Sequence, residues 1–301
     1  MRRSVAVMLT FSAAAALAYP PAAAPATARR VTTAGCVESE TARLTRPRDT
    51  HRPGPDVVRM DRELNQRLAR LRIAIPAQIE VPVRFHVLSS GKRGRVSRAQ
   101  VDRQISTLNA AYGGSGGGAD TGVRFVLVST DYSDNDRWFN APADNEIAIK
   151  SHLHQGGREV LNLYSAAVGG DVLGFSTFPE LQRDEPDLDG VVIDYRTMPG
   201  GTYPHYNLGY TAVHEIGHWL GVFHTFENGC RSPGDAVADT PPEEEATDGC
   251  PSGKDTCPGA GTDPVHNFMD YSFDACMREF TPGQGARIRK VWAVYRAPSE
   301  T

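Results

Sequence analysis

The chain has 301 residues, of which 40% are hydrophobic, and its formal net charge at pH 7 is -4. This length is enough for one domain with a sizeable buried core. The slightly acidic balance excludes the strongly basic surface on which nucleic-acid-binding domains rely, so we expect no nucleic-acid partner.

The N-terminus has the pattern of a secretory signal peptide. Arg2 and Arg3 precede an apolar run from Val5 to Ala18 that is too short for a comfortable membrane span, and a small-residue cleavage signal follows at Ala26–Ala28. A membrane anchor is the alternative, but prolines follow the apolar run at once. We therefore expect a signal peptide over residues 1–28, export from the cell and no membrane partner.

A pro-segment is expected after the signal peptide. Residues 29–57 are rich in Arg, Thr, Pro and Asp and too poor in apolar residues to form a core. Residues 61–72 carry leucines at helical spacing, which predicts an amphipathic helix on the domain or within the pro-segment. We expect the pro-segment over 29–60, with an end as late as about residue 75 as the alternative. The catalytic domain is expected over 61–301, with the mature start in the arginine-rich stretch between Arg43 and Arg72.

The catalytic domain is predicted to be α+β. Apolar patterns predict strands at 79–88, 123–128, 160–166, 173–178 and 191–195. Helical spacing predicts helices at 97–112, 145–153, 210–220 and 282–295. From about residue 221 to 281 the chain is rich in Gly, Pro and Asp and is predicted to form loops. We therefore expect a twisted mixed sheet with helices up to about residue 221, followed by a loop-rich C-terminal subdomain.

The stretch from His214 to His224 has the most specific chemical pattern in the chain, H-E-x-x-H-x-x-G-x-x-H. Histidines four residues apart share one face of a helix, so His214 and His218 can bind one zinc ion with Glu215 beside it as general base. Gly221 can end the helix in a left-handed turn that brings in His224 as third ligand. Three protein ligands leave an open position, which is typical of catalytic zinc. A chance match on a buried helix is the alternative, and the number of fixed positions argues against it.

Four of the five cysteines follow this motif: Cys230, Cys250, Cys257 and Cys276. In an oxidising compartment they are expected to form two disulfides, and the residues alone leave three pairings open. The absence of a Cys-x-x-Cys spacing argues against a second zinc site. Cys36 is left over near the N-terminus.

A methionine turn follows in Asn267-Phe268-Met269-Asp270-Tyr271. Alone, Met269 would be an ordinary core methionine; after the extended zinc motif it indicates the Met-turn of metzincins, an apolar floor under the histidines. With HEIGHWLGVFHTF, GDAVADTPPE and NFMDYSFDACM, the chain resembles the pappalysin family of metzincin metalloproteases, and within it the short, secreted, ulilysin-like type. The resemblance covers about residues 60–295.

The resemblance implies roles for residues around the zinc. Tyr271 would stabilise the tetrahedral intermediate. Asp274 would select Arg or Lys at P1′, for which a structural turn residue is the alternative. The substrate would lie along an edge strand formed by Leu173, Gly174, Phe175 and Ser176.

The resemblance also implies stabilising features. The disulfides would be Cys230–Cys257 and Cys250–Cys276. A calcium ion would be bound by Asp235, Asp239 and Thr240, for which a solvated acidic loop is the alternative. Cys36 would place its thiolate on the zinc and keep the enzyme latent, for which a surface thiol or intermolecular pairing is the alternative.

These observations predict a secreted zinc endopeptidase, made as a zymogen, that acts on proteins or peptides as a monomer or weak dimer. A zinc amidase acting on cell-wall peptides could use the same metal, water and glutamate. A catalytically inactive binding homologue is a third hypothesis, and the intact Glu215 and three histidines argue against it.

Overall fold

The computed structural model describes residues 49–50, 56–72, 74–182, 185–259 and 261–298, all of which fall within one unit, Ser39–Thr301. The predicted signal peptide, Cys36 and the rest of the pro-segment before residue 49 lie outside the described residues. No helix in this described part of the chain is long and apolar enough to cross a bilayer.

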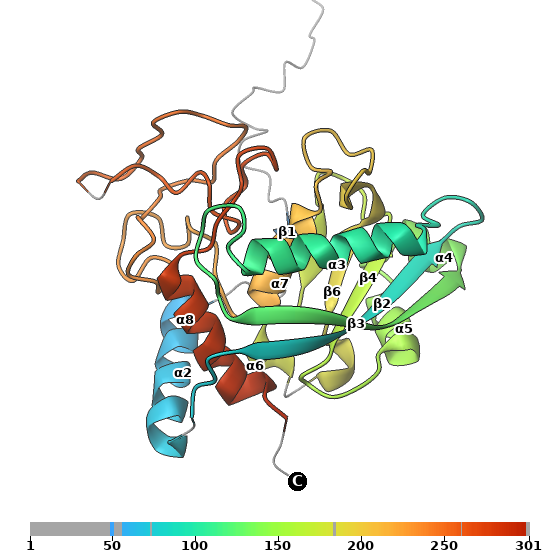
Figure 1. Ribbon diagram of the computed structural model, residues 1–301, viewed down its shortest axis with the longest axis horizontal. Coiled ribbons are helices and arrows are strands. Elements are labelled where there is room, and N and C mark those ends of the chain that lie inside the picture. The colour runs from blue at the N-terminus through green and yellow to red at the C-terminus, as the bar shows by residue number, and fades with distance from the viewer. Residues whose placement is uncertain (1–48, 51–55, 73, 183–184, 260, 299–301) are drawn as a thin grey trace, which may run out of the picture. The chain divides into compact units, whose positions relative to one another are not determined.

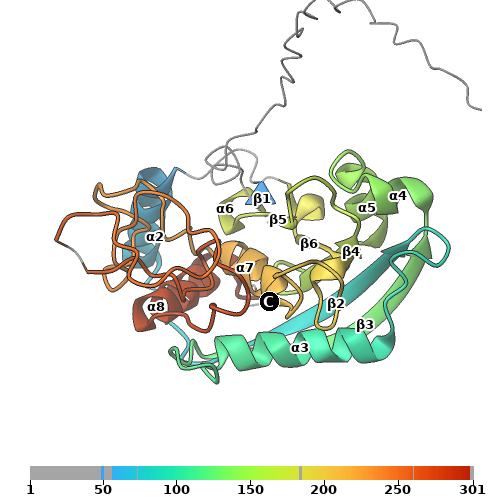
Figure 2. The same ribbon diagram turned by 90° about the horizontal axis from the view of Figure 1, so that it is seen from above.

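A six-stranded mixed sheet is the centre of the fold (Figures 1 and 2). Its order is β1-β5-β6-β4-β2-β3, with β1 at Asp49–Thr50, β2 at Ile79–Ser89, β3 at Val123–Asp134, β4 at Leu161–Ala166, β5 at Gly174–Ser176 and β6 at Val191–Asp194. Strands β3, β2, β4 and β6 are parallel, whereas β5 is antiparallel to β6. Parallel neighbours need crossover connections, and the intervening helices provide them.

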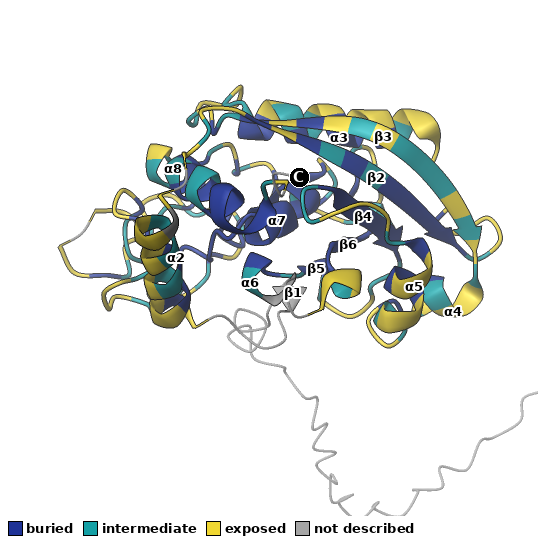
Figure 3. Ribbon diagram, turned by 90° about the horizontal axis from the view of Figure 1, so that it is seen from below, coloured by how far each residue is buried: buried dark blue, intermediate teal, exposed yellow. Residues whose placement is uncertain are grey.

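Helices cover both faces of this sheet. α3 (Arg98–Tyr112) and α7 (Tyr210–Trp219) contribute to the main core together with β2, β4 and β6. α4 (Asp136–Asn140) and α5 (Glu146–Leu153) pack on the other face, where Ile149 contacts the cluster of Tyr164 and Val192. Burial on both faces explains why β4 and β6 are buried at every position. Figure 3 shows α7 as the most deeply buried helix, while the outer sides of α2 and α3 are exposed.

The chain after α7 is irregular until the last helix. Disulfides Cys230–Cys257 and Cys250–Cys276 cross-link these loops, which is the pairing that the resemblance implies. α8 (Pro282–Val291) begins with a capping box and continues into a π-helical turn, Trp292–Arg296. α2 (Val57–Leu71) lies alongside α8 (Figure 1). Short helical turns at Pro179–Gln182 (α6), Pro186–Leu188 and Tyr195–Thr197 complete the described elements.

The predicted fold class is confirmed, and each predicted strand and helix is present. β3 continues to Asp134, beyond its predicted end at residue 128, because a bulge opposite Val83 and Arg84 breaks its alternation while pairing with β2 continues. The sequence did not predict α4 because this helix is too short to show a periodic pattern. Its start is set locally by Asn135, whose side-chain oxygen accepts hydrogen bonds from the N–H groups of Arg137 and Trp138. The predicted pro-segment boundary at residue 60 falls inside α2.

Candidate active site and metal centre

The two ends of α7 determine where the motif histidines lie. Its N-cap, Gly209, has a φ of 91° and no capping side chain. Asp274 compensates from a distant part of the chain, because its carboxylate accepts hydrogen bonds from the Leu208 N–H at 2.7 Å and from the N–H of Tyr210, the first residue of the helix. At the other end Gly221 has a φ of 82°, and any side chain there would collide with Val291. The chain reverses at this glycine and brings His224 back to the helix.

The three histidine side chains converge on one point. Nε2 of His218 lies 3.1 Å from Nε2 of His214 and 3.1 Å from Nε2 of His224. The Nδ1 atoms face acceptors at 2.7–2.8 Å: Phe268 O for His214, Val222 O for His218 and the Glu227 carboxylate for His224. Each Nδ1 therefore carries the proton, and each Nε2 presents a lone pair to the common point. This donor set fits a zinc ion with Zn–N distances of about 2.0–2.1 Å.

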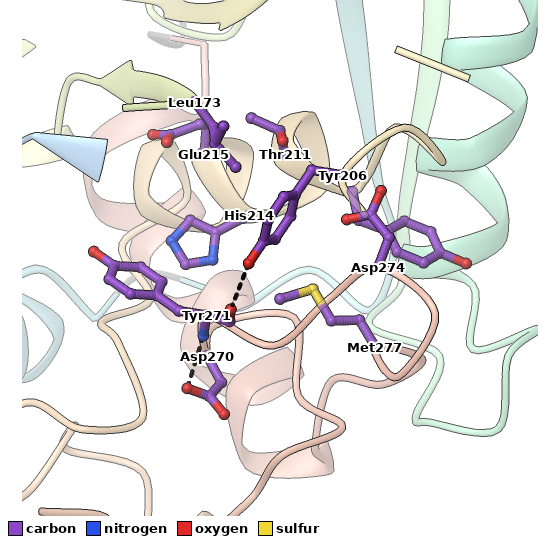
Figure 4. Close-up of a pocket in the computed structure, with 10 residues that line it drawn as sticks. Leu173, Tyr206, Thr211, His214, Glu215, Asp270, Tyr271, Asp274 and Met277 are labelled. Atoms are coloured by element: carbon purple, nitrogen blue, oxygen red, sulfur yellow. Dashed lines mark hydrogen bonds between the residues drawn. The ribbon is translucent and has the colours of Figure 1, made fainter. Parts of the chain in front are cut away.

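Glu215 is buried against strand β5. A Cβ atom at position 174 would lie 2.8 Å from Cγ and 2.9 Å from Oε1 of Glu215, which is too close for a real side chain. Glycine at this position therefore allows the carboxylate to lie between α7 and β5. The sequence assigned Gly174 only to substrate binding and did not reveal this contact. Glu215 lines a pocket together with His214 and Leu173 (Figure 4).

The predicted substrate strand forms β5, with Leu173 just before it. β6 pairs with one edge of β5, and β1 pairs with the other in parallel, with Asp49 opposite Gly174 and Thr50 opposite Phe175. A segment of the chain's own N-terminal part therefore lies along the edge at which a substrate strand would add.

The Met-turn lies beneath α7. The Met269 side chain packs against Gly217, where any Cβ atom would collide with its sulfur. Oδ1 of Asp270 accepts a hydrogen bond from the Tyr271 N–H at 2.7 Å and so fixes the next residue. The Tyr271 hydroxyl lies 3.3 Å from Nε2 of His224, and its ring lies beside His214 (Figure 4). The predicted oxyanion-stabilising group is therefore next to the point on which the histidines converge.

Asp274 lines the same pocket as Tyr206 and Met277 (Figure 4). Tyr210 also lines this pocket. Burial raises the pKa of Asp274 to about 7, against the N–H groups of Leu208 and Tyr210, which lower it. Asp274 therefore lines the pocket, as a residue that selects the P1′ side chain would. It also caps α7, which is a structural role like the alternative considered from the sequence.

The three predicted calcium ligands are in different surroundings. Asp239 accepts hydrogen bonds from the Thr281 hydroxyl and the Gly283 N–H, both at 2.8 Å, and so holds the start of α8. Asp235 is buried, its Oδ1 atom accepts a hydrogen bond from the Val237 N–H at 3.0 Å, and the Thr240 hydroxyl lies close enough to the carboxylate to lower the pKa of Asp235. Burial raises the pKa of Asp235 to about 7. Hard, buried oxygens suit calcium, so calcium binding stays a prediction, with Asp235 and Thr240 better placed than Asp239.

A buried charge cluster behind the site was not anticipated. Glu243 accepts a hydrogen bond from the Thr225 hydroxyl at 2.8 Å and pairs with the Lys254 ammonium, which also lies 3.1 Å from Asp263. Burial raises the pKa of Glu243 to about 7, with a further contribution from Asp270. Because Thr225 directly follows His224, this cluster fixes the chain behind the third histidine. The acidic run at 243–245 was the one sequence signal for it.

Comparisons with known proteins place this geometry in a family. A family model described as pregnancy-associated plasma protein-A matches residues 170–293, which include the zinc motif and the Met-turn. An extracellular metalloprotease of Sordaria macrospora is 40% identical over 259 residues, which is 82% of this chain and 88% of that protein. Extracellular metalloprotease 1 of Coccidioides posadasii is 42% identical over 229 residues, which is 74% of this chain and 80% of that protein.

Solved structures agree with the sequence relatives. Promirolysin of Tannerella forsythia superposes with a TM-score of 0.67 at 26% identity, covering 80% of this chain and 91% of that one. Mature mirolysin of the same organism, in complex with a cleaved peptide, gives a TM-score of 0.60 at 28% identity, covering 73% and 99%. The chain belongs to the pappalysin family of metzincins and is an extracellular zinc metalloendopeptidase.

Proposed function

We propose that His214, His218 and His224 hold the zinc ion and that Glu215 is the general base in peptide-bond hydrolysis. The convergence of three Nε2 lone pairs beside a buried carboxylate carries this proposal. A zinc ion held there would supply a Lewis acid that polarises the scissile carbonyl and lowers the pKa of a water molecule to about 7. Glu215 accepts the proton of the attacking water and later delivers it to the leaving amine.

Tyr271 stabilises the tetrahedral intermediate in this proposal. Its hydroxyl is close to the reacting atoms, since it lies 3.3 Å from Nε2 of His224. Two hydrogen bonds hold the backbone of Tyr271. Its N–H donates to the Asp270 carboxylate, and its carbonyl oxygen accepts from the Tyr206 hydroxyl at 3.3 Å. A donor fixed in advance where negative charge develops needs no reorganisation during the reaction.

The substrate lies extended along β5, and its P1′ side chain enters the pocket that Asp274 lines. Tyr206, Tyr210 and Met277 offer apolar contacts for the stem of a long side chain. A buried carboxylate beyond them favours the cationic end of Arg or Lys, because burying the carboxylate charge without a cation is costly.

The enzyme is made as a zymogen in this proposal, with a pro-segment that begins at residue 29 and the Cys36 thiolate on the zinc. The described cysteines pair with one another in two disulfides, which leaves Cys36 without an intramolecular cysteine partner among them. β1 supports the idea independently, because residues just upstream of α2 lie along the substrate edge of β5.

Replacement of Glu215 by Gln tests the assigned mechanism. Glu215→Gln preserves size but cannot accept the proton, so kcat should fall at least about a hundredfold while zinc content stays at the wild-type level. The exposed strand residue Glu80 offers a matched control, and Glu80→Gln should have wild-type activity. Retained turnover in purified Glu215→Gln would refute the general-base role.

A further inference from the structure

Helix α2 covers the back of the zinc motif. Its residues Val57 and Met60 form one buried apolar cluster with Phe178 and Phe223. The Phe178 ring lies 5.3 Å from the ring of His218 and 5.5 Å from that of Phe223. Phe223 directly precedes His224 in the chain. α2 therefore completes an apolar layer against which this part of the site rests.

One buried cation links α2 to the turn between α7 and His224. Arg287 of α8 is 5% exposed, its Nη1 donates to Asp61 Oδ1 at 2.8 Å, and its Nε donates to Gly221 O at 2.7 Å. Its guanidinium lies over the Phe223 ring, 4.6 Å from the centroid. Within the described chain, Asp61 is the carboxylate that hydrogen-bonds this guanidinium. Arg287 thus contacts both Gly221, where the chain reverses, and Phe223, which precedes the third histidine.

We propose that Asp61 and Arg287 are positioning residues for His224 and that α2 remains part of the active enzyme. Without the Asp61 carboxylate, the buried guanidinium would be drawn toward other acceptors and away from Gly221 and Phe223. Loss of the whole helix would also expose the apolar cluster at Phe178 and Phe223.

Retention of α2 limits where activation can occur. The activating cut lies before Val57, so the arginines within the helix are not processing sites, although the sequence alone left the whole stretch from Arg43 to Arg72 open. This inference rests on the proposed role of His224 as a zinc ligand.

Asp61→Asn in the secreted, active enzyme is the test, because it preserves size and removes the charge. Zinc release to a colorimetric chelator should be about tenfold faster, and kcat should fall about tenfold with little change in KM, since no substrate contact is altered. The visible spectrum of the cobalt-substituted enzyme should change as well. Glu63→Gln is the matched control, because Glu63 is in the same helix but pairs with Arg67 and Arg59. N-terminal sequencing of the active form should give a start before Val57.

Wild-type zinc release, cobalt spectrum and kcat in Asp61→Asn would overturn the positioning role. An active form that begins after Leu71 would overturn the retention of α2. His224→Ala tests separately whether His224 is a zinc ligand. If His224 were not a ligand, this variant would keep its zinc, whatever the result for Asp61→Asn.

Discussion

Two glycines in the active site have no room for a side chain. Gly217 faces the sulfur of Met269, and Gly174 faces the carboxylate of Glu215. Neither requirement comes from an unusual φ, since neither residue is among the glycines of positive φ. Both come from close approach between α7 and a neighbouring segment.

Gly174→Ala should displace the Glu215 carboxylate. The new Cβ would also meet Val192 O at 2.9 Å, so the strand cannot simply move aside. We expect kcat/KM for a peptide substrate to fall about a hundredfold, because small misplacements of a catalytic group have effects of this order. Zinc content should be unchanged. Ser165→Ala in strand β4, which adds no atom to the sheet, should stay near wild type; equal activities of the two variants would contradict the prediction.

Asp274 should make the P1′ preference depend on pH. Its pKa is raised by burial to about 7, so the group is neutral below that pH and a carboxylate above it. The ratio of kcat/KM for Arg over Leu at P1′ should therefore rise about tenfold between about pH 6 and pH 8. Asp274→Asn keeps an acceptor for the Leu208 N–H and should give a ratio that does not vary with pH. A flat ratio in the wild-type enzyme would exclude this role.

At the scale of elements, α7 is held at both ends by residues from elsewhere in the chain. Asp274 caps its start, and Arg296 of the final π-helical turn donates to Trp219 O at 2.8 Å at its end. The same guanidinium pairs with the buried Asp189 at 2.7 and 3.0 Å and lies 3.7 Å over the Trp219 ring. The C-terminal helix therefore fixes the helix that carries the zinc motif.

Arg296→Met should destabilise the fold strongly, because it leaves Asp189 buried without its cation. We expect the free energy of unfolding to fall by about 3–5 kcal/mol, measured by denaturant titration with the disulfides intact. The exposed Arg278, which pairs with Glu279, provides the comparison, and Arg278→Met should cost less than about 1 kcal/mol. A similar fall in the free energy of unfolding in both variants would show that the buried Arg296–Asp189 pair stabilises the fold no more than the exposed Arg278–Glu279 pair does.

At the scale of the whole molecule, the site is assembled from segments that are far apart in the sequence. α7 supplies two histidines and Glu215, the loop after it supplies His224, and the Met-turn supplies Tyr271. α2 packs behind them, and β1 lies along the substrate edge. The N-terminal part of the described chain therefore contacts the site in two ways, and the contact that β1 makes suits control of activity by processing.

Cys36→Ser should release the latency of the unprocessed enzyme. A serine hydroxyl is a far weaker zinc ligand than a thiolate, so the open position would no longer be filled. Peptidase activity should appear before any N-terminal cleavage, which can be followed by assaying samples of known N-terminal sequence. Ser39→Ala, close in sequence, should stay latent like the wild type. Continued latency of Cys36→Ser would rule out the thiolate switch.

The zinc helix, most strands and the metzincin resemblance could be predicted from the sequence because they depend on local spacing. His214 and His218 share a helix face, Gly221 permits the reversal, and alternating apolar residues mark β2. Other features could not be predicted from the sequence: the strand order, the capping of α7 by Asp274, the hydrogen bonds of Asp239 at the start of α8, and the contact of Asp61 with Arg287. Each of these features depends on contacts between residues that are far apart in the chain and come together only in the folded protein. Periodicity in the sequence reports local structure and does not indicate such contacts. The sequence by itself therefore determined the metal and the reaction class, whereas only the tertiary structure decided what holds Glu215 and His224 in place, because packing between distant segments sets those contacts.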